Sequence, residues 1–191
     1  RVPLTALERI KNLHGNGTAA VAVVTYGNRA FDDTFAELQD ALEAQGFVAV
    51  AGVAAVTQHS IVNQFGAGRP NAEDQTQLQA FGKEIAEKLT GTPKRAELPG
   101  NRPYLERHGG GLVPMVSDAC KGCGKCVTHC PVGAIPKDNP KTTDKDLCVP
   151  CMGCISVCTQ KARSLPEAAI GMLTEKLSKV CADRKENQLF F

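Results

Sequence analysis

CKGCGKCVTHCP (Cys120–Pro131) and CVPCMGCISVCT (Cys148–Thr159) decide how the C-terminal half of this 191-residue chain folds. Each run carries four cysteines, and every cysteine of the second run follows its counterpart in the first by 28 positions, as 148 follows 120. A constant offset across four cysteines is typical of a duplicated supersecondary unit. The two runs therefore predict a small α+β domain built from two similar halves.

The chemistry of these runs follows from how the thiols are grouped. Eight of the nine cysteines lie in the two runs, whereas disulfide frameworks spread cysteines along a chain. Each run has the C-x2-C-x2-C-x3-C spacing of the bacterial four-iron ferredoxin motif, followed by Pro131 in the first run and by Thr159 in the second. Two zinc sites are the alternative, but zinc more often takes paired C-x2-C hooks together with histidine. The spacing thus favours two [4Fe-4S] clusters.

The ligands of each cluster are expected to come from both runs. Three closely spaced thiolates wrap around one cluster, and the fourth cysteine of the run binds the other cluster. The first cluster is then expected on Cys120, Cys123, Cys126 and Cys158, and the second on Cys148, Cys151, Cys154 and Cys130. Cys181, the ninth cysteine, falls on the apolar side of a helix and is expected to be a buried structural thiol.

Composition excludes several classes of partner. A net charge of +2, no Trp and only 5% aromatic residues argue against a nucleic-acid surface. No apolar run approaches the length of a membrane span, and the start of the chain has no signal-peptide pattern. Reduced, metal-binding thiols then predict a cytoplasmic protein whose partners are other redox proteins.

Residues 1–91 contain no cysteine and alternate between helical and strand patterns. Continuous apolar runs at 19–25 and 47–56 predict strands buried on both faces, and helical spacing is seen near 4–13, 31–42 and 72–90. This order predicts an α/β domain with parallel strands. A Pro/Gly-rich linker is expected at 92–117, and the ferredoxin domain with a C-terminal helix and tail at 118–191.

The loop after the first strand, YGNRAFDD, lies where open α/β sheets bind ligands, although a simple tight turn is the alternative. This loop, together with RVP at the start, GF, GRP, the doubled cysteine run and the tail KENQLFF, resembles the fused flavodoxin–ferredoxin electron carriers of anaerobes. The resemblance covers nearly the whole chain but only the latter part of the family's flavodoxin domain. It implies a partial flavodoxin-like parallel sheet that starts within that domain.

The same resemblance implies an FMN site. Arg1, Val2 and Pro3 match the end of the family's middle flavin loop, and the last flavin loop corresponds to Tyr26, Gly27, Asn28 and Arg29. The Thr/Gly phosphate loop of the family has no counterpart in this sequence.

Two functions remain open from the sequence. In the first, the chain carries single electrons through two [4Fe-4S] clusters and exchanges them with FMN. In the second, the α/β half binds no flavin and docks the ferredoxin domain as a subunit of a larger oxidoreductase. No catalytic arrangement is visible in the sequence, which favours a redox carrier over an enzyme with its own substrate.

Overall fold

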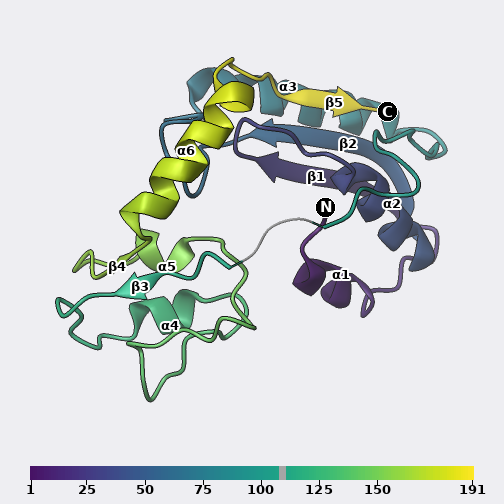
Figure 1. Cartoon of the computed structure of the whole chain (residues 1–191). Helices are drawn as coiled ribbons and strands as arrows, with labels where there is room; N and C mark the ends of the chain where they lie inside the picture. The colour runs from purple at the N-terminus through teal and green to yellow at the C-terminus, as the bar shows by residue number, and fades with distance from the viewer. Residues whose placement is uncertain (108–110) are drawn as a thin grey trace. The chain divides into compact units, whose positions relative to one another are not determined.

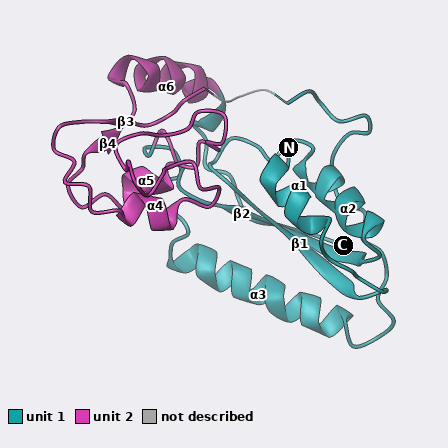
Figure 2. Ribbon diagram, turned by 90° about the horizontal axis from the view of Figure 1, so that it is seen from below, with its two compact units in different colours: residues 1–59, 63–107, 180–191 teal, residues 60–62, 108–179 magenta. Residues whose placement is uncertain are grey.

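The structure is a computed structural model of the whole chain, and it describes residues 1–107 and 111–191. Two compact units are distinguished in Figure 2. The α/β unit comprises Arg1–His59, Asn63–Arg107 and Val180–Phe191, and the cysteine unit comprises Ser60–Val62 and the described part of 108–179. Among the described residues, no helix combines the length and the apolar character needed to cross a membrane.

The α/β unit is organised around two parallel strands (Figure 1), which agree with the two expected from the sequence. β1 (Ala19–Tyr26) pairs along its whole length with β2 (Val48–Val56), and α2 (Thr34–Ala44) connects them. The unit also contains α1 (Leu4–Ile10) and α3 (Ala72–Lys88). Figure 2 shows α3 on one side of the sheet and α1 and α2 on the other.

A third strand comes from the C-terminal tail, which the sequence analysis assigned to the ferredoxin domain. β5 (Gln188–Phe190) instead runs antiparallel to the centre of β2, so the sheet is mixed. Alternating side chains explain this position. Phe190 packs against Phe35 on the α2 side, with ring centroids 5.4 Å apart, whereas Leu189 and Phe191 pack on the α3 side. The tail therefore completes the core of the α/β unit.

The two parallel strands differ in burial. β2 is buried on both faces, between α2 and α3, as its continuous apolar run predicted. β1 was predicted to be equally buried, but only Ala22 and Val24 are, while Val21 and Val23 are 37% and 58% exposed. Within the described residues, β1 is also an edge strand of the sheet. One face of β1 thus presents apolar side chains.

The expected linker contributes to the α/β core before the chain enters the cysteine unit. Ala96 and Leu98 are buried, and the Ala96 N–H donates to the Ala49 carbonyl over 2.7 Å. Asp33, at the start of α2, accepts hydrogen bonds from the N–H groups of Asn101 and Leu105, both over 2.7 Å. These contacts fix the course of residues 96–105 along α2.

Asp74 is the centre of a buried polar network at the start of α3. Its carboxylate binds the Arg69 guanidinium with two hydrogen bonds, accepts one from the Asn187 amide over 3.0 Å, and closes a capping box with Asn71. The side chains of Asp74 and Arg69 are 0% and 4% exposed. Because Asn187 directly precedes β5, the network also anchors the C-terminal strand.

Replacing Asp74 with asparagine is expected to lower the free energy of unfolding by about 3 kcal/mol, because it leaves the Arg69 charge buried without its partner. Hydrogen bonds from Arg69 lower the pKa of Asp74, so its contribution is present above the ordinary value of 3.8 and declines as the pH falls below it. The gap between wild type and variant should therefore narrow in acid. Denaturant unfolding measures both effects, and Glu73→Gln, at a 77% exposed side chain, is the matched control. Equal stability of the two variants at neutral pH would contradict the prediction.

The cysteine unit has little regular structure. Its elements are β3 (Met115–Val116), α4 (Lys125–His129), α5 (Gly153–Ser156), β4 (Arg163–Ser164) and most of α6 (Glu167–Cys181). β3 and β4 form a short antiparallel pair. The loops between these elements carry most of the cysteines.

Candidate functional site

The two cysteine runs share their backbone conformation at the start of each helix. α4 begins after Gly124 and α5 after Met152, and both residues lie in the left-handed region with φ of 75° and 58°. Gly124 and Met152 are related by the 28-residue offset of the sequence. Each carbonyl accepts hydrogen bonds from the N–H groups three and four residues later. The duplication predicted from cysteine spacing is thus present in the backbone.

The correspondence continues beyond the fourth cysteine of each run. Gly133 and Lys161 both have positive φ, of 67° and 49°. The turn that follows aims one backbone N–H at a sulfur atom. Ala134 donates to Cys130 Sγ over 3.3 Å, and Ala162 donates to Cys158 Sγ over 3.2 Å. Hydrogen bonds of this kind stabilise thiolates and tune the iron–sulfur centres that they bind.

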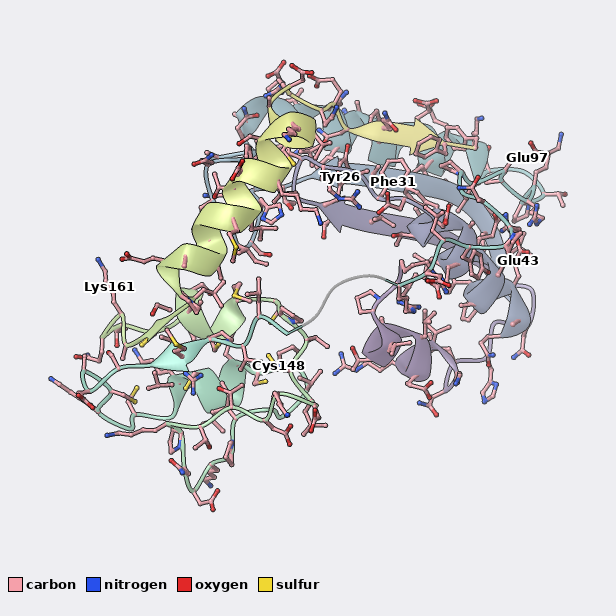
Figure 3. The ribbon with its side chains drawn as sticks, viewed as in Figure 1. Tyr26, Phe31, Glu43, Glu97, Cys148 and Lys161 are labelled. Atoms are coloured by element: carbon pink, nitrogen blue, oxygen red, sulfur yellow. The ribbon has the colours of Figure 1, made fainter. Side chains whose placement is uncertain are left out.

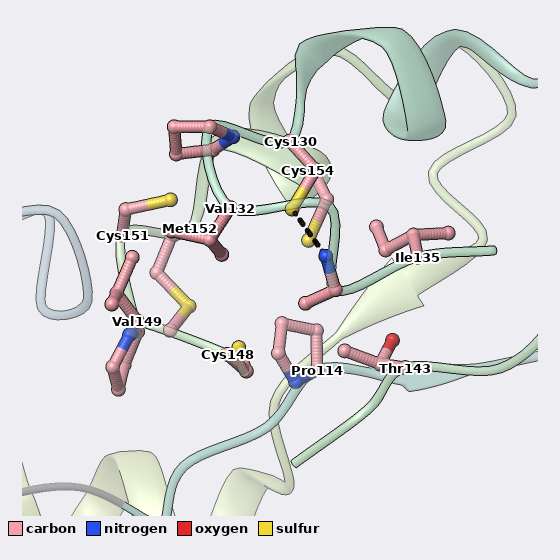
Figure 4. A pocket seen from close by; sticks show the side chains of 13 residues that line it. Pro114, Cys130, Val132, Ile135, Thr143, Cys148, Val149, Cys151, Met152 and Cys154 are labelled. Atoms are coloured by element: carbon pink, nitrogen blue, oxygen red, sulfur yellow. Dashed lines mark hydrogen bonds between the residues drawn. The ribbon is translucent and has the colours of Figure 1, made fainter. Parts of the chain in front are cut away.

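Four thiols from both runs surround one cavity in the cysteine unit (Figure 4). Its enclosed volume is small, about 20 Å³. Its thiols are those expected to bind the second cluster, namely Cys130, Cys148, Cys151 and Cys154. Most of the other lining residues are apolar, among them Val132, Ile135, Val149 and Met152. An apolar pocket ringed by four thiols suits the chemistry of a [4Fe-4S] cluster.

The cysteines expected to bind the first cluster come from segments that a backbone hydrogen bond joins. The Ser117 N–H donates to the Ala162 carbonyl over 2.9 Å, just before Cys120 and just after Cys158. The matching bond in the other half runs from Asp144 to Ala134 over 2.7 Å. Each half therefore joins the segment before a first cysteine to the segment after the other run's fourth cysteine.

Burial, neighbouring thiols and backbone hydrogen bonds shift the pKa values of the thiols. Burial raises the pKa of Cys148 and Cys154, and neighbouring thiols raise it further. Burial also acts to raise the pKa of Cys158, but hydrogen bonds from backbone N–H groups, Ala162 first, outweigh it and lower the pKa. Among the described residues, no three Cys, His, Asp or Glu side chains form a group suited to one metal ion. A [4Fe-4S] cluster does not require such a group, because its thiolates bind different iron atoms around the cluster.

The expected flavin residues divide into two pairs. Tyr26 and Arg29 line one hollow of the α/β unit together with Arg1, Val2 and Pro3. Tyr26 packs edge to face on Phe31, with centroids 5.4 Å apart; both are labelled in Figure 3. The structure therefore brings together the two sequence segments that the flavodoxin resemblance associates with the flavin.

Gly27 and Asn28 have other surroundings. A Cβ atom at Gly27 would lie 2.7 Å from the Cα of His59, so glycine allows this close approach. The Asn28 side chain is buried and donates to the carbonyls of Cys181 and Asp183 over 2.8 and 3.0 Å. Asn28 thus holds the end of α6, and its side chain does not line the hollow. Sequence gave no signal for this role, because the partners lie more than 150 positions away.

Cys181 is 2% exposed, which confirms the expectation of a buried thiol, and burial raises its pKa. A further residue was missed in the sequence. Arg163 is only 3% exposed and donates hydrogen bonds to Thr143 Oγ1 and to the Pro140 carbonyl over 2.8 and 2.6 Å. The 28-residue offset could have revealed it, because the corresponding residue of the first run is Ile135.

Comparisons with known proteins agree with this geometry. Residues 113–135 match the 4Fe-4S binding domain, which covers the first cysteine run. The chain is also 31% identical over 97 residues to the formate dehydrogenase iron-sulfur subunit of Haemophilus influenzae. That similarity covers 50% of this chain and 30% of the relative's length. No solved structure matches the chain. The matched domain and the cysteine geometry together identify an iron–sulfur protein of electron transfer that binds a 4Fe-4S cluster.

Proposed function

We propose that the chain passes single electrons through two [4Fe-4S] clusters, each held by three cysteines of one run and the fourth cysteine of the other. The first cluster would be held by Cys120, Cys123, Cys126 and Cys158, and the second by Cys148, Cys151, Cys154 and Cys130. When bound, the clusters supply the redox chemistry. The chain holds them at fixed positions and directs backbone N–H groups at the thiolates of Cys130 and Cys158.

The cavity in Figure 4 is the observation that carries this proposal. Cys130 lies in it beside the three cysteines of the other run, although it is 18 positions before Cys148 in the sequence. The matching hydrogen bonds at Cys130 and Cys158 support the same arrangement in the other half. Crossed ligation would make the two halves depend on each other, since neither run completes a cluster alone.

The hollow beside β1 supports an FMN site in the α/β unit. It combines the aromatic rings of Tyr26 and Phe31 with Arg1 and Arg29, which form ion pairs with Glu37 and Asp32. Aromatic rings are suited to the flat ring system of a flavin. The phosphate loop of flavodoxins is missing from the sequence, so FMN would depend on this hollow and on any further segment that completes it.

A second function is favoured by the surface of β1. Val21 and Val23 are exposed on this edge strand, and the Asn28 side chain is already engaged by the C-terminal segment. The matched relative is itself described as a subunit. In this alternative, the α/β unit binds no flavin and docks the electron-carrying unit on a larger oxidoreductase.

Cofactor content tests the proposal and separates the two versions. Protein purified without oxygen is expected to contain about eight iron atoms and eight acid-labile sulfides per chain, as two [4Fe-4S] clusters require. About four of each would contradict the two-cluster proposal. Flavin released by acid is then measured by fluorescence. About one FMN per chain would support flavin–cluster exchange, and no flavin would leave the docking function.

A further inference from the structure

The two halves of the cysteine unit differ in charge at one buried position, which is Arg163 in the second half. It occupies the position in the second run that Ile135 occupies in the first, and both residues are 3% exposed. Their neighbours Ala134 and Ala162 are also buried and make the same hydrogen bond to sulfur. One half therefore buries an aliphatic side chain where the other buries a guanidinium.

Within the described part of the chain, the hydrogen-bond acceptors of Arg163 are neutral. Its guanidinium donates to Thr143 Oγ1 over 2.8 Å and to the carbonyls of Pro140 and Thr142 over 2.6 and 3.2 Å. Among the described residues, no Asp or Glu forms an ion pair with it. A buried charge without a counter-charge costs several kcal/mol. The site therefore calls for a negative group near Arg163.

Thiolates of the second group are that negative partner. Thr143, which accepts a hydrogen bond from Arg163, lines the same cavity as Cys148 and Cys154. The other two acceptors of the guanidinium, the carbonyls of Pro140 and Thr142, belong to the same chain segment as Thr143. The hydrogen bonds therefore hold the positive charge against the wall of this cavity.

We propose that Arg163 sets the reduction potential of the cluster held by Cys148, Cys151, Cys154 and Cys130 above that of the other cluster. This inference rests on the proposed two-cluster function. Reduction adds one electron from a redox partner protein to the site, without making or breaking a bond, and makes the site more negative by one charge. The fixed positive charge of Arg163 stabilises that reduced state in a poorly solvated cavity. An electron entering the unit would therefore rest on the second cluster.

The test is a redox titration followed by EPR on oxygen-free protein, comparing wild type with Arg163→Gln. The variant removes the charge but keeps hydrogen-bonding capacity. We expect the equilibrium constant for reduction of the second cluster to fall at least tenfold, about 59 mV for a one-electron couple. The reduction potential of the first cluster should change less. The Cys158→Ala background, which lacks a ligand of the first cluster, identifies the signal of the second.

Two controls separate charge from structure. Lys161→Gln removes a positive charge two positions away at an exposed side chain, labelled in Figure 3, and should leave both potentials unchanged. Arg163→Lys keeps the charge and should retain a potential near that of wild type. If Arg163→Gln loses its second cluster, the Arg163→Lys variant distinguishes an effect of charge from a structural role. A wild-type-like potential supports the proposal, and loss of the cluster there too would show a structural role and overturn it.

Iron content distinguishes failure of this inference from failure of the proposed function. About eight iron atoms per chain with no shift in Arg163→Gln would overturn the role of Arg163 alone. About four iron atoms per chain in the wild type would overturn both, since there would be no second cluster for Arg163 to tune.

Discussion

Replacing Cys130 with alanine is expected to remove the cluster anchored by the other run and to leave the cluster of its own run in place. Cys130 shares its cavity with Cys148, Cys151 and Cys154 rather than with the cysteines that precede it in the sequence. Iron should fall from about eight to about four atoms per chain, because loss of a thiolate opens one coordination site of one cluster. Metal analysis and EPR of the reduced protein measure both effects.

Matched variants show which cluster is lost. Cys148→Ala removes a cysteine of the second run itself, and its EPR spectrum should match that of Cys130→Ala. Cys158→Ala should instead match Cys120→Ala. Cys181→Ala, which changes the buried ninth thiol, should keep about eight iron atoms. If Cys130→Ala matched Cys120→Ala, each run would bind its own cluster and the crossed arrangement would be wrong.

The regularity of the cysteine spacing explains why this site could be outlined from sequence. A 28-residue offset predicts equivalent backbones, and the left-handed residues Gly124 and Met152 show that equivalence in the structure. Glycine alone would have suggested the first of these positions but not the second, because methionine seldom adopts positive φ. Spacing was therefore more informative than residue type.

The parts that sequence could not predict depend on distant partners. The β5 segment pairs with β2 more than 130 positions away, and Asn28 binds the chain around Cys181. The side-chain alternation of β5 was visible, but the tail was too short for its pattern to indicate a sheet. For strand β1, in contrast, the sequence predicted more burial than the structure shows. Its apolar run predicted burial on both faces, because sequence does not reveal whether anything covers a face.

The two units differ in what stabilises them. The α/β unit has a continuous core in which β2 is buried on both faces and Phe35 is fully enclosed. Among its described residues, the cysteine unit has few buried apolar side chains, namely Val62, Pro114, Cys126, Ala134, Ile135, Met152, Ala162, Leu165 and Leu177. Its helices before α6 have five and four residues. Small domains with so little core usually depend on metal for their stability.

Removal of iron is therefore expected to unfold the cysteine unit and to spare the α/β unit. Oxygen-free protein is treated with a chelator and a mild oxidant, and amide hydrogen exchange is compared before and after. Amides of α4, α5 and the β3–β4 pair should exchange about a hundredfold faster or more, which corresponds to about 2.7 kcal/mol of lost local stability. Amides of β2 should keep their protection, because that strand lies in the apolar core of the other unit.

The comparison between the two units is the internal control, since both are measured in the same molecule. Unchanged protection of α4 and α5 after complete loss of iron would show that the thiol-lined cavity is held by the protein alone. Loss of protection in β2 as well would show that the α/β unit depends on the clusters. The expected result lies between these outcomes. Without metal, nothing joins the four thiols that line the cavity of the cysteine unit, and water can enter it. The apolar core around Phe35 contains no metal ligand and should stay folded.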